Sequence, residues 1–216
     1  MSQRPFFVAL EGIDGSGKDT LAVRLEEHFV EKHNLEVAVT EEPTQGSIGV
    51  LIRRMLDGEI PAPSANIVFQ ALFIEDRAFH IQSLIRPKLL RNNLVISVRY
   101  WLSTIAYGML DGTAAEYIAF HRRVVGEELI VPDLTIILDL ETEETMRRIQ
   151  AAGRKFDWFA KKEKLERIRQ NYLELAKSRI AALGTIVVVD AMKSKEEVAL
   201  DAEAAIERWY LMRIYS

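Results

Sequence analysis

The chain has 216 residues, no cysteine, a formal net charge of −4 and 49% hydrophobic residues. This length and apolar content suit one α/β domain with a sizeable core, and the absence of cysteine excludes disulfides and thiolate metal sites. The slightly acidic charge argues against a surface that coats nucleic acid, and no apolar run approaches the roughly 18 residues of a membrane span. Since no signal peptide opens the chain, we expect a soluble cytoplasmic protein with small-molecule partners and neither nucleic-acid nor membrane partners.

The first predicted elements are a strand, a glycine-rich loop and a helix. The apolar run 6–11 predicts a buried strand, and a helical pattern extends from Gly17 to about His33. Between them the phosphate-loop motif G-x-x-x-x-G-K-[ST] is met from Gly12 to Lys18. It fails at its last position, where Asp19 replaces the hydroxyl residue and Thr20 follows one place late.

This loop is a candidate phosphate-binding site. Its glycines allow backbone angles closed to other residues and leave room for an anion, toward which successive N–H groups converge. The helix N-terminus adds its dipole, and Lys18 reaches the outer phosphates as a mobile charge. We expect nucleotide contacts from every residue of the loop: Gly12, Ile13, Asp14, Gly15, Ser16, Gly17, Lys18, Asp19 and Thr20.

Residues 36–40 predict the second strand, which gives a βαβ opening with a parallel strand pair. After a loop and a short helix, Ser64 is placed to cap a helix from Ala65 to at least Leu84, with Pro87 kinking or ending it. Positions 73, 76, 77 and 80 of this helix bring a ring, a carboxylate, a guanidinium and an imidazole to one face. That face either packs in the core, with its charges paired, or belongs to a binding site.

The remaining strands are predicted at 94–98, 134–140 and 185–190. Arg99 and Tyr100 follow the third strand at its carboxyl end, where open parallel sheets place their ligands. The cationic segment at about 151–162 is either a solvated helical face or a mobile lid. Ser194 and Glu197 fit a capping box that opens a C-terminal helix. We therefore expect one α/β domain, residues 1–216, in which helices flank a five-stranded parallel sheet and the lid is an insertion.

These segments together resemble the thymidylate kinases, a family of P-loop nucleoside monophosphate kinases, along nearly the whole chain. The matching residues, in the family's order, are Leu10 to Lys18; Thr40 to Pro43 with Ile48-Gly49 and Ile52-Arg53; Leu72 to Arg77 with His80; Ile96 to Tyr100 with Ser103, Ala106 and Tyr107; and Pro132 to Thr135. The resemblance implies a three-layer P-loop NTPase fold, ATP and Mg²⁺ as cofactors, a homodimer, and phosphoryl transfer from ATP to dTMP to give dTDP.

The resemblance also implies roles for residues of an acceptor site. Phe73 would stack on the pyrimidine, Arg77 would hydrogen-bond its edge, and Tyr107 would exclude a 2′-hydroxyl. Arg99 and Arg53 would bind the acceptor phosphate, and Lys18 and Arg99 would stabilise the transferring charge. The implied acceptor residues are Asp14, Glu42, Pro43, Arg53, Phe73, Arg77, Arg99, Tyr100, Thr104 and Tyr107.

Two departures from the family's pattern concern the metal. The family usually has Asp-Arg-Tyr after the third strand, whereas this chain has Val98 before Arg99, and Asp19 stands in place of the loop hydroxyl. We hypothesise that Asp19 supplies the carboxylate missing at Val98, with Asp14 near the sugar or a metal-bound water, because Mg²⁺ accepts carboxylate oxygens. Thr20 is turned roughly 100° away along the helix and is not expected to replace the hydroxyl.

Two other functions stay open at this point. A P-loop kinase for another monophosphate, or for a nucleoside, would keep Lys18 and Arg99 but differ around the base and sugar. A nucleoside is disfavoured, because it would leave the charges of Arg99 and Arg53 unpaired. The second alternative is a catalytically weakened or non-catalytic nucleotide-binding protein, since the metal ligands are altered around a retained lysine.

The lid carries a third departure from the family, which commonly has an arginine after an aspartate there. In this chain Trp158 follows Asp157, and Arg154 and Lys155 lie close enough in sequence to act on the transition state. We predict that Arg154→Ala lowers kcat more than it raises KM, because a cation that acts on developing charge stabilises the transition state more than the bound substrate. Steady-state kinetics measure both constants, and an unaltered kcat would assign these cations to a solvated face.

Overall fold

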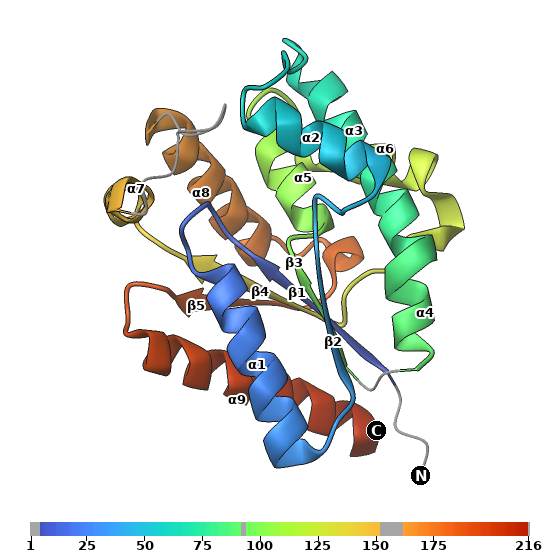
Figure 1. The fold of residues 1–216 in the computed structure, drawn as a ribbon, viewed down its shortest axis with the longest axis vertical. Coiled ribbons are helices and arrows are strands. Elements are labelled where there is room, and N and C mark those ends of the chain that lie inside the picture. The colour runs from blue at the N-terminus through green and yellow to red at the C-terminus, as the bar shows by residue number, and fades with distance from the viewer. Residues whose placement is uncertain (1–4, 92–93, 152–161, 216) are drawn as a thin grey trace.

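The computed structural model describes residues 5–91, 94–151 and 162–215. Their centre is a five-stranded parallel sheet in the order β2-β3-β1-β4-β5 (Figure 1). The strands are β1 (Phe6–Glu11), β2 (Val37–Glu41), β3 (Leu94–Val98), β4 (Leu134–Asp139) and β5 (Ile186–Asp190). Each predicted strand therefore lies within about one residue of its observed bounds, and the expected α/β class is confirmed.

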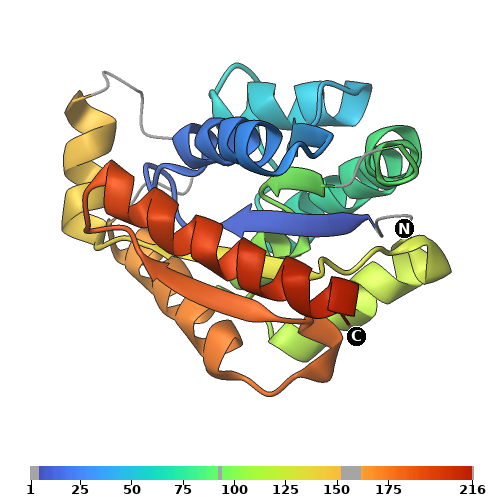
Figure 2. The ribbon, with the colours of Figure 1, turned by 90° about the horizontal axis from the view of Figure 1, so that it is seen from below.

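Helices occupy the connections and cover both faces of the sheet. They are α1 (Lys18–His33), α2 (Ser47–Leu56), α3 (Asn66–His80), α4 (Arg86–Leu89), α5 (Trp101–Gly108), α6 (Ala114–Val124), α7 (Thr142–Ala151), α8 (Lys162–Lys177) and α9 (Lys195–Tyr215). Helices α1 and α9 pack on one face, and α3, α5 and α8 pack on the other (Figures 1 and 2). Among the described residues, no helix combines the length and apolarity that a membrane crossing requires.

The alternation of side chains in β1 explains why both faces are covered. Phe6, Val8 and Leu10 belong to the core cluster of α1 and α9, whereas Phe7 and Ala9 belong to that of α3, α5 and α8. A central parallel strand that is apolar on both faces is stable only between two helical layers. This arrangement leaves the carboxyl ends of the strands as the edge where polar groups gather.

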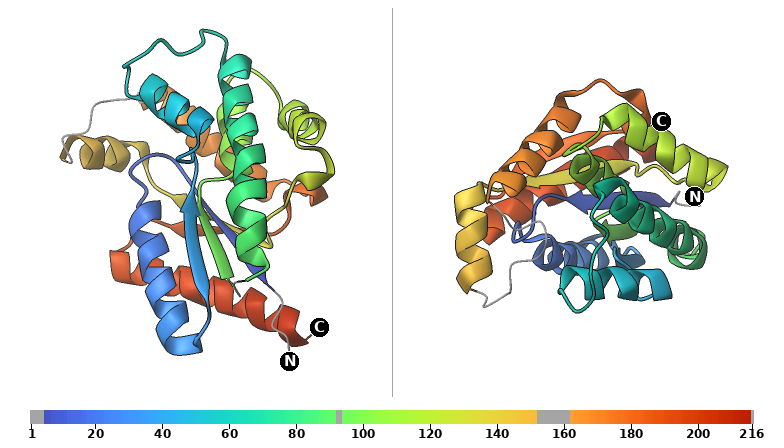
Figure 3. Two further views of the ribbon diagram at one scale, coloured as in Figure 1. Left: turned by 45° about the vertical axis from the view of Figure 1, so that its right-hand side comes forward. Right: turned by 90° about the horizontal axis from the view of Figure 1, so that it is seen from above.

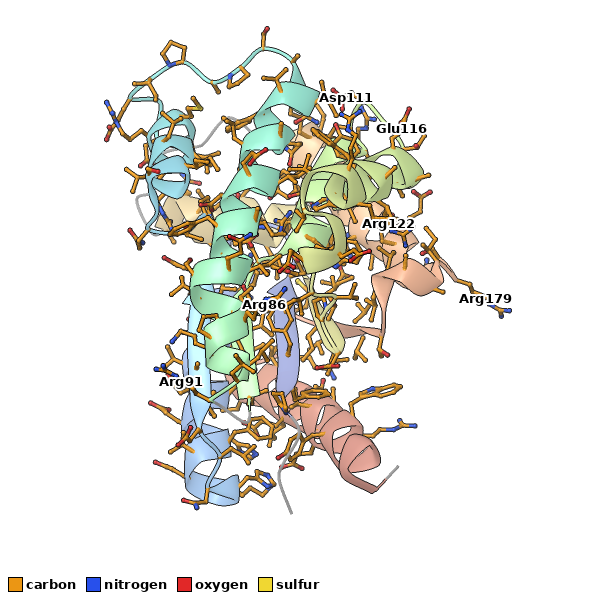
Figure 4. All side chains as sticks on the ribbon, turned by 90° about the vertical axis from the view of Figure 1, so that its right-hand side faces the viewer. Arg86, Arg91, Asp111, Glu116, Arg122 and Arg179 are labelled. Carbon is orange, nitrogen blue, oxygen red and sulfur yellow. The ribbon has the colours of Figure 1, made fainter. Side chains whose placement is uncertain are left out.

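Several helix ends follow their predicted signals. Asn34 ends α1 in the left-handed conformation with φ of 51°. The predicted capping box is confirmed at the start of α9, where the Ser194 hydroxyl accepts the Glu197 N–H at 3.3 Å and the Glu197 carboxylate accepts the Ser194 N–H at 3.0 Å. A capping box that the sequence analysis did not predict opens α6, where Glu116, labelled in Figure 4, accepts the Thr113 N–H at 2.7 Å.

The prediction that Ser64 caps α3 is wrong. The helix begins at Asn66, and Ala65 occupies the capping position without a side-chain hydrogen bond. The Asn66 amide donates instead to the Tyr107 carbonyl at 3.0 Å and to Asp111 at 3.1 Å. These contacts with residues more than forty positions away fix the start of the helix, and a local cap is not needed.

The long predicted helix consists of three parts that run as one rod beside the sheet (Figure 3). α3 passes into a π-helical turn at Ile81–Ile85, and α4 follows with Pro87 in its first turn. The wider π turn accommodates Pro87, which has no N–H and whose ring crowds the preceding turn. Ile81 and Ile85 are both fully buried, so the inserted residue keeps both aliphatic side chains in the core.

The predicted lid at about 151–162 falls almost wholly within residues 152–161, outside the described residues. The same holds for the lid candidate Arg154.

Candidate functional site

The loop between β1 and α1 has the backbone of an anion-binding turn. Gly12, Gly15 and Gly17 adopt φ of 137°, 74° and 93°. A Cβ at Gly12 would also lie 2.6 Å from the Leu138 carbonyl oxygen, so only glycine fits there. Because α1 begins directly after Gly17, its first N–H groups are unpaired at the mouth of the loop.

Lys18 is folded back over this loop. Its Nζ donates to the carbonyl oxygens of Gly12 at 3.1 Å and Ile13 at 2.9 Å and to the Ser16 hydroxyl at 3.3 Å. Burial, together with the nearby Arg99 guanidinium, lowers the pKa of Lys18 to about 7. An anion in the loop would reverse this effect, because negative charge favours the protonated amine.

A broad cleft opens over the loop and is rich in cationic side chains. They come from α1, α2, the end of β3, α7, the segment after β5 and the start of α9: Arg24, Arg53, Arg99, Arg147, Arg148, Lys193 and Lys195. Arg148 donates to the Gly15 carbonyl at 3.4 Å and to the Ala191 carbonyl at 3.2 Å, which places it beside the phosphate loop. The sequence analysis gave Arg148 no role, although Arg148 lies on α7, directly before the cationic segment at about 151–162.

The candidate metal ligands lie at this cleft. Asp19, exposed in the first turn of α1, and Val98, at the end of β3, both line it. Asp14 lines both this cleft and a second, smaller cavity. Mg²⁺ is usually held by one or two carboxylates together with water and substrate phosphates, so the chemistry of this donor set fits the ion.

The second cavity encloses about 470 Å³ of empty space that is partly open to solvent, and it lies between α3, α5 and the phosphate loop. Nine of the ten acceptor residues named from the sequence line it: Asp14, Glu42, Pro43, Phe73, Arg77, Arg99, Tyr100, Thr104 and Tyr107. The tenth, Arg53, lines the adjoining cleft. Three further lining residues, Leu56, Gln70 and Ser103, were not assigned to the acceptor site from the sequence.

Arg99 joins the cavity to the phosphate loop. Its Nη1 donates to the Gly12 carbonyl at 3.1 Å and to the Ser103 hydroxyl at 3.2 Å, and its Nη2 forms an ion pair with Asp14. The guanidinium lies 5.7 Å from the centre of the Tyr107 ring. With φ of 63°, Arg99 has a left-handed backbone that is unusual for a residue with a Cβ.

The charges on the predicted face of α3 are paired. Arg77 Nη2 donates to Glu42 at 2.5 Å, and its Nη1 donates to the Thr104 hydroxyl at 3.1 Å. His80 Nδ1 lies 2.9 Å from the other oxygen of Glu42, while its Nε2 lies 2.6 Å from the Thr40 hydroxyl. Since a carboxylate only accepts, Nδ1 of His80 carries a proton and donates to Glu42.

The residues of this helix face are divided between structural contacts and the lining of the cavity. Asp76 accepts the Thr44 N–H at 2.7 Å and the Thr44 hydroxyl at 2.6 Å, so it holds the loop that contains the cis Glu42-Pro43 peptide. Phe73 and Arg77 line the cavity instead. Arg77 Nε is buried and has no hydrogen-bond partner among the described residues, which leaves one N–H for a ligand.

The sequence analysis assigned no role to Glu11, although it organises one wall of the cavity. Its carboxylate accepts the N–H groups of Tyr100 at 3.0 Å and Ser103 at 3.1 Å, at the start of α5, and the Tyr172 hydroxyl at 3.2 Å. Burial raises the pKa of Glu11. The only sequence signal was an acidic residue at the end of an apolar strand, directly before the glycine loop.

Tyr100 contributes to the cavity through its ring. Its hydroxyl donates to the Ile130 carbonyl at 2.9 Å, and the Arg77 guanidinium lies 5.1 Å from the ring centre. The neighbouring His121 accepts from Arg77 through Nε2 at 2.6 Å, and burial lowers the pKa of His121 to about 3, so its ring stays neutral.

Comparison with known proteins agrees with this geometry. A family model described as thymidylate kinase matches residues 10–201. A probable thymidylate kinase of Thermococcus onnurineus is 36% identical over 213 residues, which cover 96% of this chain and 100% of the relative. A probable thymidylate kinase of Pyrobaculum calidifontis is 39% identical, and the matched residues cover 94% of this chain and 96% of the relative. A probable thymidylate kinase of Methanoculleus marisnigri is 38% identical, and the matched residues cover 89% of each chain. The chain belongs to the thymidylate kinase family.

Proposed function

We propose that this protein transfers the γ-phosphoryl group of ATP to dTMP, giving ADP and dTDP. The observation that carries the proposal is the position of the acceptor cavity, whose lining includes a phenylalanine, two arginines and two tyrosines directly beside the phosphate loop. Asp14 and Arg99 line both the cavity and the cleft over the loop, so acceptor and donor phosphates would meet at these residues.

Phe73 and Arg77 are suited to a pyrimidine base. The Phe73 ring can stack on a planar base, and the free Nε–H of Arg77 can donate to a carbonyl oxygen on the edge of the base. Glu42, His121 and Thr104 hold the rest of this guanidinium, so its position is set before the base arrives. Tyr107, buried in the cavity wall, would crowd a 2′-hydroxyl and favour a deoxyribose.

Arg99 and Lys18 are suited to bind the phosphates. Arg99 would exchange part of its contact with Asp14 for the acceptor phosphate, and Arg53 would bind the same dianion from the cleft side. Lys18 would leave the carbonyl oxygens of Gly12 and Ile13 for the β- and γ-phosphates of ATP. No strong general base is required, because the attacking phosphate oxygen is already anionic.

Asp19 and Asp14 would hold Mg²⁺, which supplies charge neutralisation at the transferring phosphates when it is bound. The carboxylate at the end of β3 that the family usually has is replaced here by Val98, and Asp19 lines the same cleft.

We extend the proposal to a homodimer that forms through the outward face of α3. Val68 and Phe79, 52% and 49% exposed, are eleven residues apart and therefore on one face, and Val50 of the neighbouring α2 is 42% exposed.

The central experiment is an ADP-release assay with ATP and Mg²⁺ against dTMP, dUMP, UMP, dCMP, dGMP and AMP. We expect the highest kcat/KM with dTMP and a much lower value with UMP, because of Tyr107. Lys18→Met serves as the inactive control. Activity only with a purine monophosphate would contradict the roles of Phe73 and Arg77. Tight ATP binding without ADP formation would instead indicate a nucleotide-binding protein.

Binding of ATP is expected to take up a proton at Lys18. With a pKa of about 7 in the free protein, the amine is largely neutral at higher pH, and the phosphates favour its charged form. Affinity for ATP should therefore fall as the pH rises from about 7.5 to 9, where the phosphates themselves are fully ionised. Calorimetry in two buffers of different ionisation enthalpy measures the uptake. Lys18→Arg, which stays protonated, should show none, and equal heats for the unmodified protein would refute the idea.

The metal role of Asp19 can be tested by moving the carboxylate from position 19 to position 98. We expect Asp19→Ala to lower kcat roughly 10-fold or more and to raise the Mg²⁺ concentration needed for half-maximal rate. Val98→Asp in the Asp19→Ser background restores the family's pattern, and we expect it to recover both kcat and the original Mg²⁺ dependence. Thr20→Val, the neighbouring substitution, should change little. If Asp19→Ala leaves turnover and magnesium dependence unchanged, the compensation hypothesis is wrong.

The dimer is tested by light scattering after size-exclusion chromatography. Val68→Arg combined with Phe79→Arg should convert the protein to a monomer, because two charges would be buried without partners. Leu200→Arg is the matched control, since Leu200 is 62% exposed on α9, away from α3. A monomeric unmodified protein, or a dimer that persists in the double variant, would reject this interface.

A further inference from the structure

A cluster of histidine and carboxylate side chains lies at the end of α1 farthest from the phosphate loop. There the last turns of α1 pack against α9 (Figures 1 and 2). His28, Lys32 and His33 come from α1, and Glu203 and Glu207 come from α9. None of these residues takes part in the proposed phosphoryl transfer.

Three ligand atoms converge in this cluster. Glu207 Oε1 lies 3.1 Å from His28 Nε2 and 2.8 Å from His33 Nε2. The three groups can each turn one ligand atom toward a common point, and these atoms lie within 4.8 Å of one another. The His33 ring is held in place by Phe29, on which it stacks with a centroid distance of 5.3 Å.

His28 has a carboxylate at each of its two ring nitrogens. Its Nδ1 lies 3.2 Å from Glu203 and its Nε2 lies 3.1 Å from Glu207. A neutral imidazole has one N–H, so one nitrogen would turn its lone pair toward a carboxylate unless the ring is doubly protonated. A metal ion between Nε2 and Glu207 removes this conflict, while Nδ1–H donates to Glu203. Metal-bound histidines almost always make such a second hydrogen bond to a carboxylate or carbonyl.

We propose that His28 Nε2, His33 Nε2 and Glu207 Oε1 bind a divalent transition-metal ion of the Zn²⁺ class, with Glu203 orienting His28. Two imidazoles and one carboxylate are ligands that Zn²⁺ prefers, with water in the fourth position, whereas Mg²⁺ prefers oxygen alone. The C-terminal end of the α1 dipole also favours a cation there. The bound ion ties α9 to the helix that begins at Lys18.

Lys32 lowers the metal affinity of this site, because it competes for Glu207. Its Nζ lies 2.9 Å from Glu207 Oε1 and its side chain is 58% exposed, so it competes with the metal but can rotate into solvent. A glutamate carboxylate is ionised at neutral pH, so Glu207 can act as a ligand once Lys32 has turned away.

Co²⁺ and Zn²⁺ are suitable probes for the metal-free full chain without nucleotide. The chain has no cysteine, and its other two histidines, His80 and His121, are fully buried, so the signal can be assigned. We expect one equivalent of Co²⁺ to give a visible absorption band that Zn²⁺ abolishes. At a roughly 100-fold excess over its Kd, Zn²⁺ should raise Tm by about 5–10 °C.

Substitutions within the cluster separate metal binding from a general effect on folding. His33→Gln and Glu207→Gln should abolish the Co²⁺ band while circular dichroism stays unchanged, and Glu203→Gln should weaken binding roughly 10-fold. Lys32→Gln should strengthen metal binding several-fold, whereas the other substitutions weaken it. A purely structural role of the cluster would not produce this increase in affinity. Asp19→Asn should leave the band intact, because it changes only the phosphate loop. Absence of saturable Co²⁺ binding, or a band that survives His33→Gln, would overturn the proposal, and neither result depends on kinase activity.

Discussion

The ion pair between Glu42 and Arg77 is buried on both sides, with only 3% and 1% of the two side chains exposed. Taking two charges out of water is offset only where the geometry is good and the remaining polar atoms find partners. His80 occupies the second oxygen of Glu42, and Thr104 and the neutral ring of His121 accept from Arg77. This network ties α3 to the end of β2 and thereby fixes where Phe73 lies.

Glu11 plays the corresponding part for α5. It holds the first N–H groups of that helix at the end of β1, the strand two places from β2 in the sheet. β3 lies between them and carries Arg99 at its end. Three neighbouring strand ends therefore position the two walls of the cavity and the Arg99 guanidinium between them. A ligand meets side chains that are already in place, so binding costs little conformational entropy.

The strands and the phosphate loop could be predicted from local patterns in the sequence, namely apolar runs and glycine spacing. Most of the cavity lining was predicted instead from the resemblance to the thymidylate kinase family, whose motifs occur in the same order along this chain. The partners of the charged side chains could not be predicted from the sequence. The pairing of Asp76 with Thr44 and of Glu11 with the start of α5 joins residues 32 and about 90 positions apart. The false cap at Ser64 has the same origin, since Asn66 is held by Tyr107 and Asp111. Arg154 and the metal role of Asp19 stay predictions.

The left-handed backbone of Arg99 has a consequence for how this protein can change over evolutionary time. That conformation costs about 1–2 kcal/mol for a residue with a Cβ, and glycine would relieve it. Under the proposed role of Arg99 in phosphate binding, the strain of the backbone favours glycine at this position, whereas activity favours arginine. A lineage that no longer needed the activity would lose the selection that keeps arginine in this conformation, so residue 99 is where loss of function would be expected to leave an early trace.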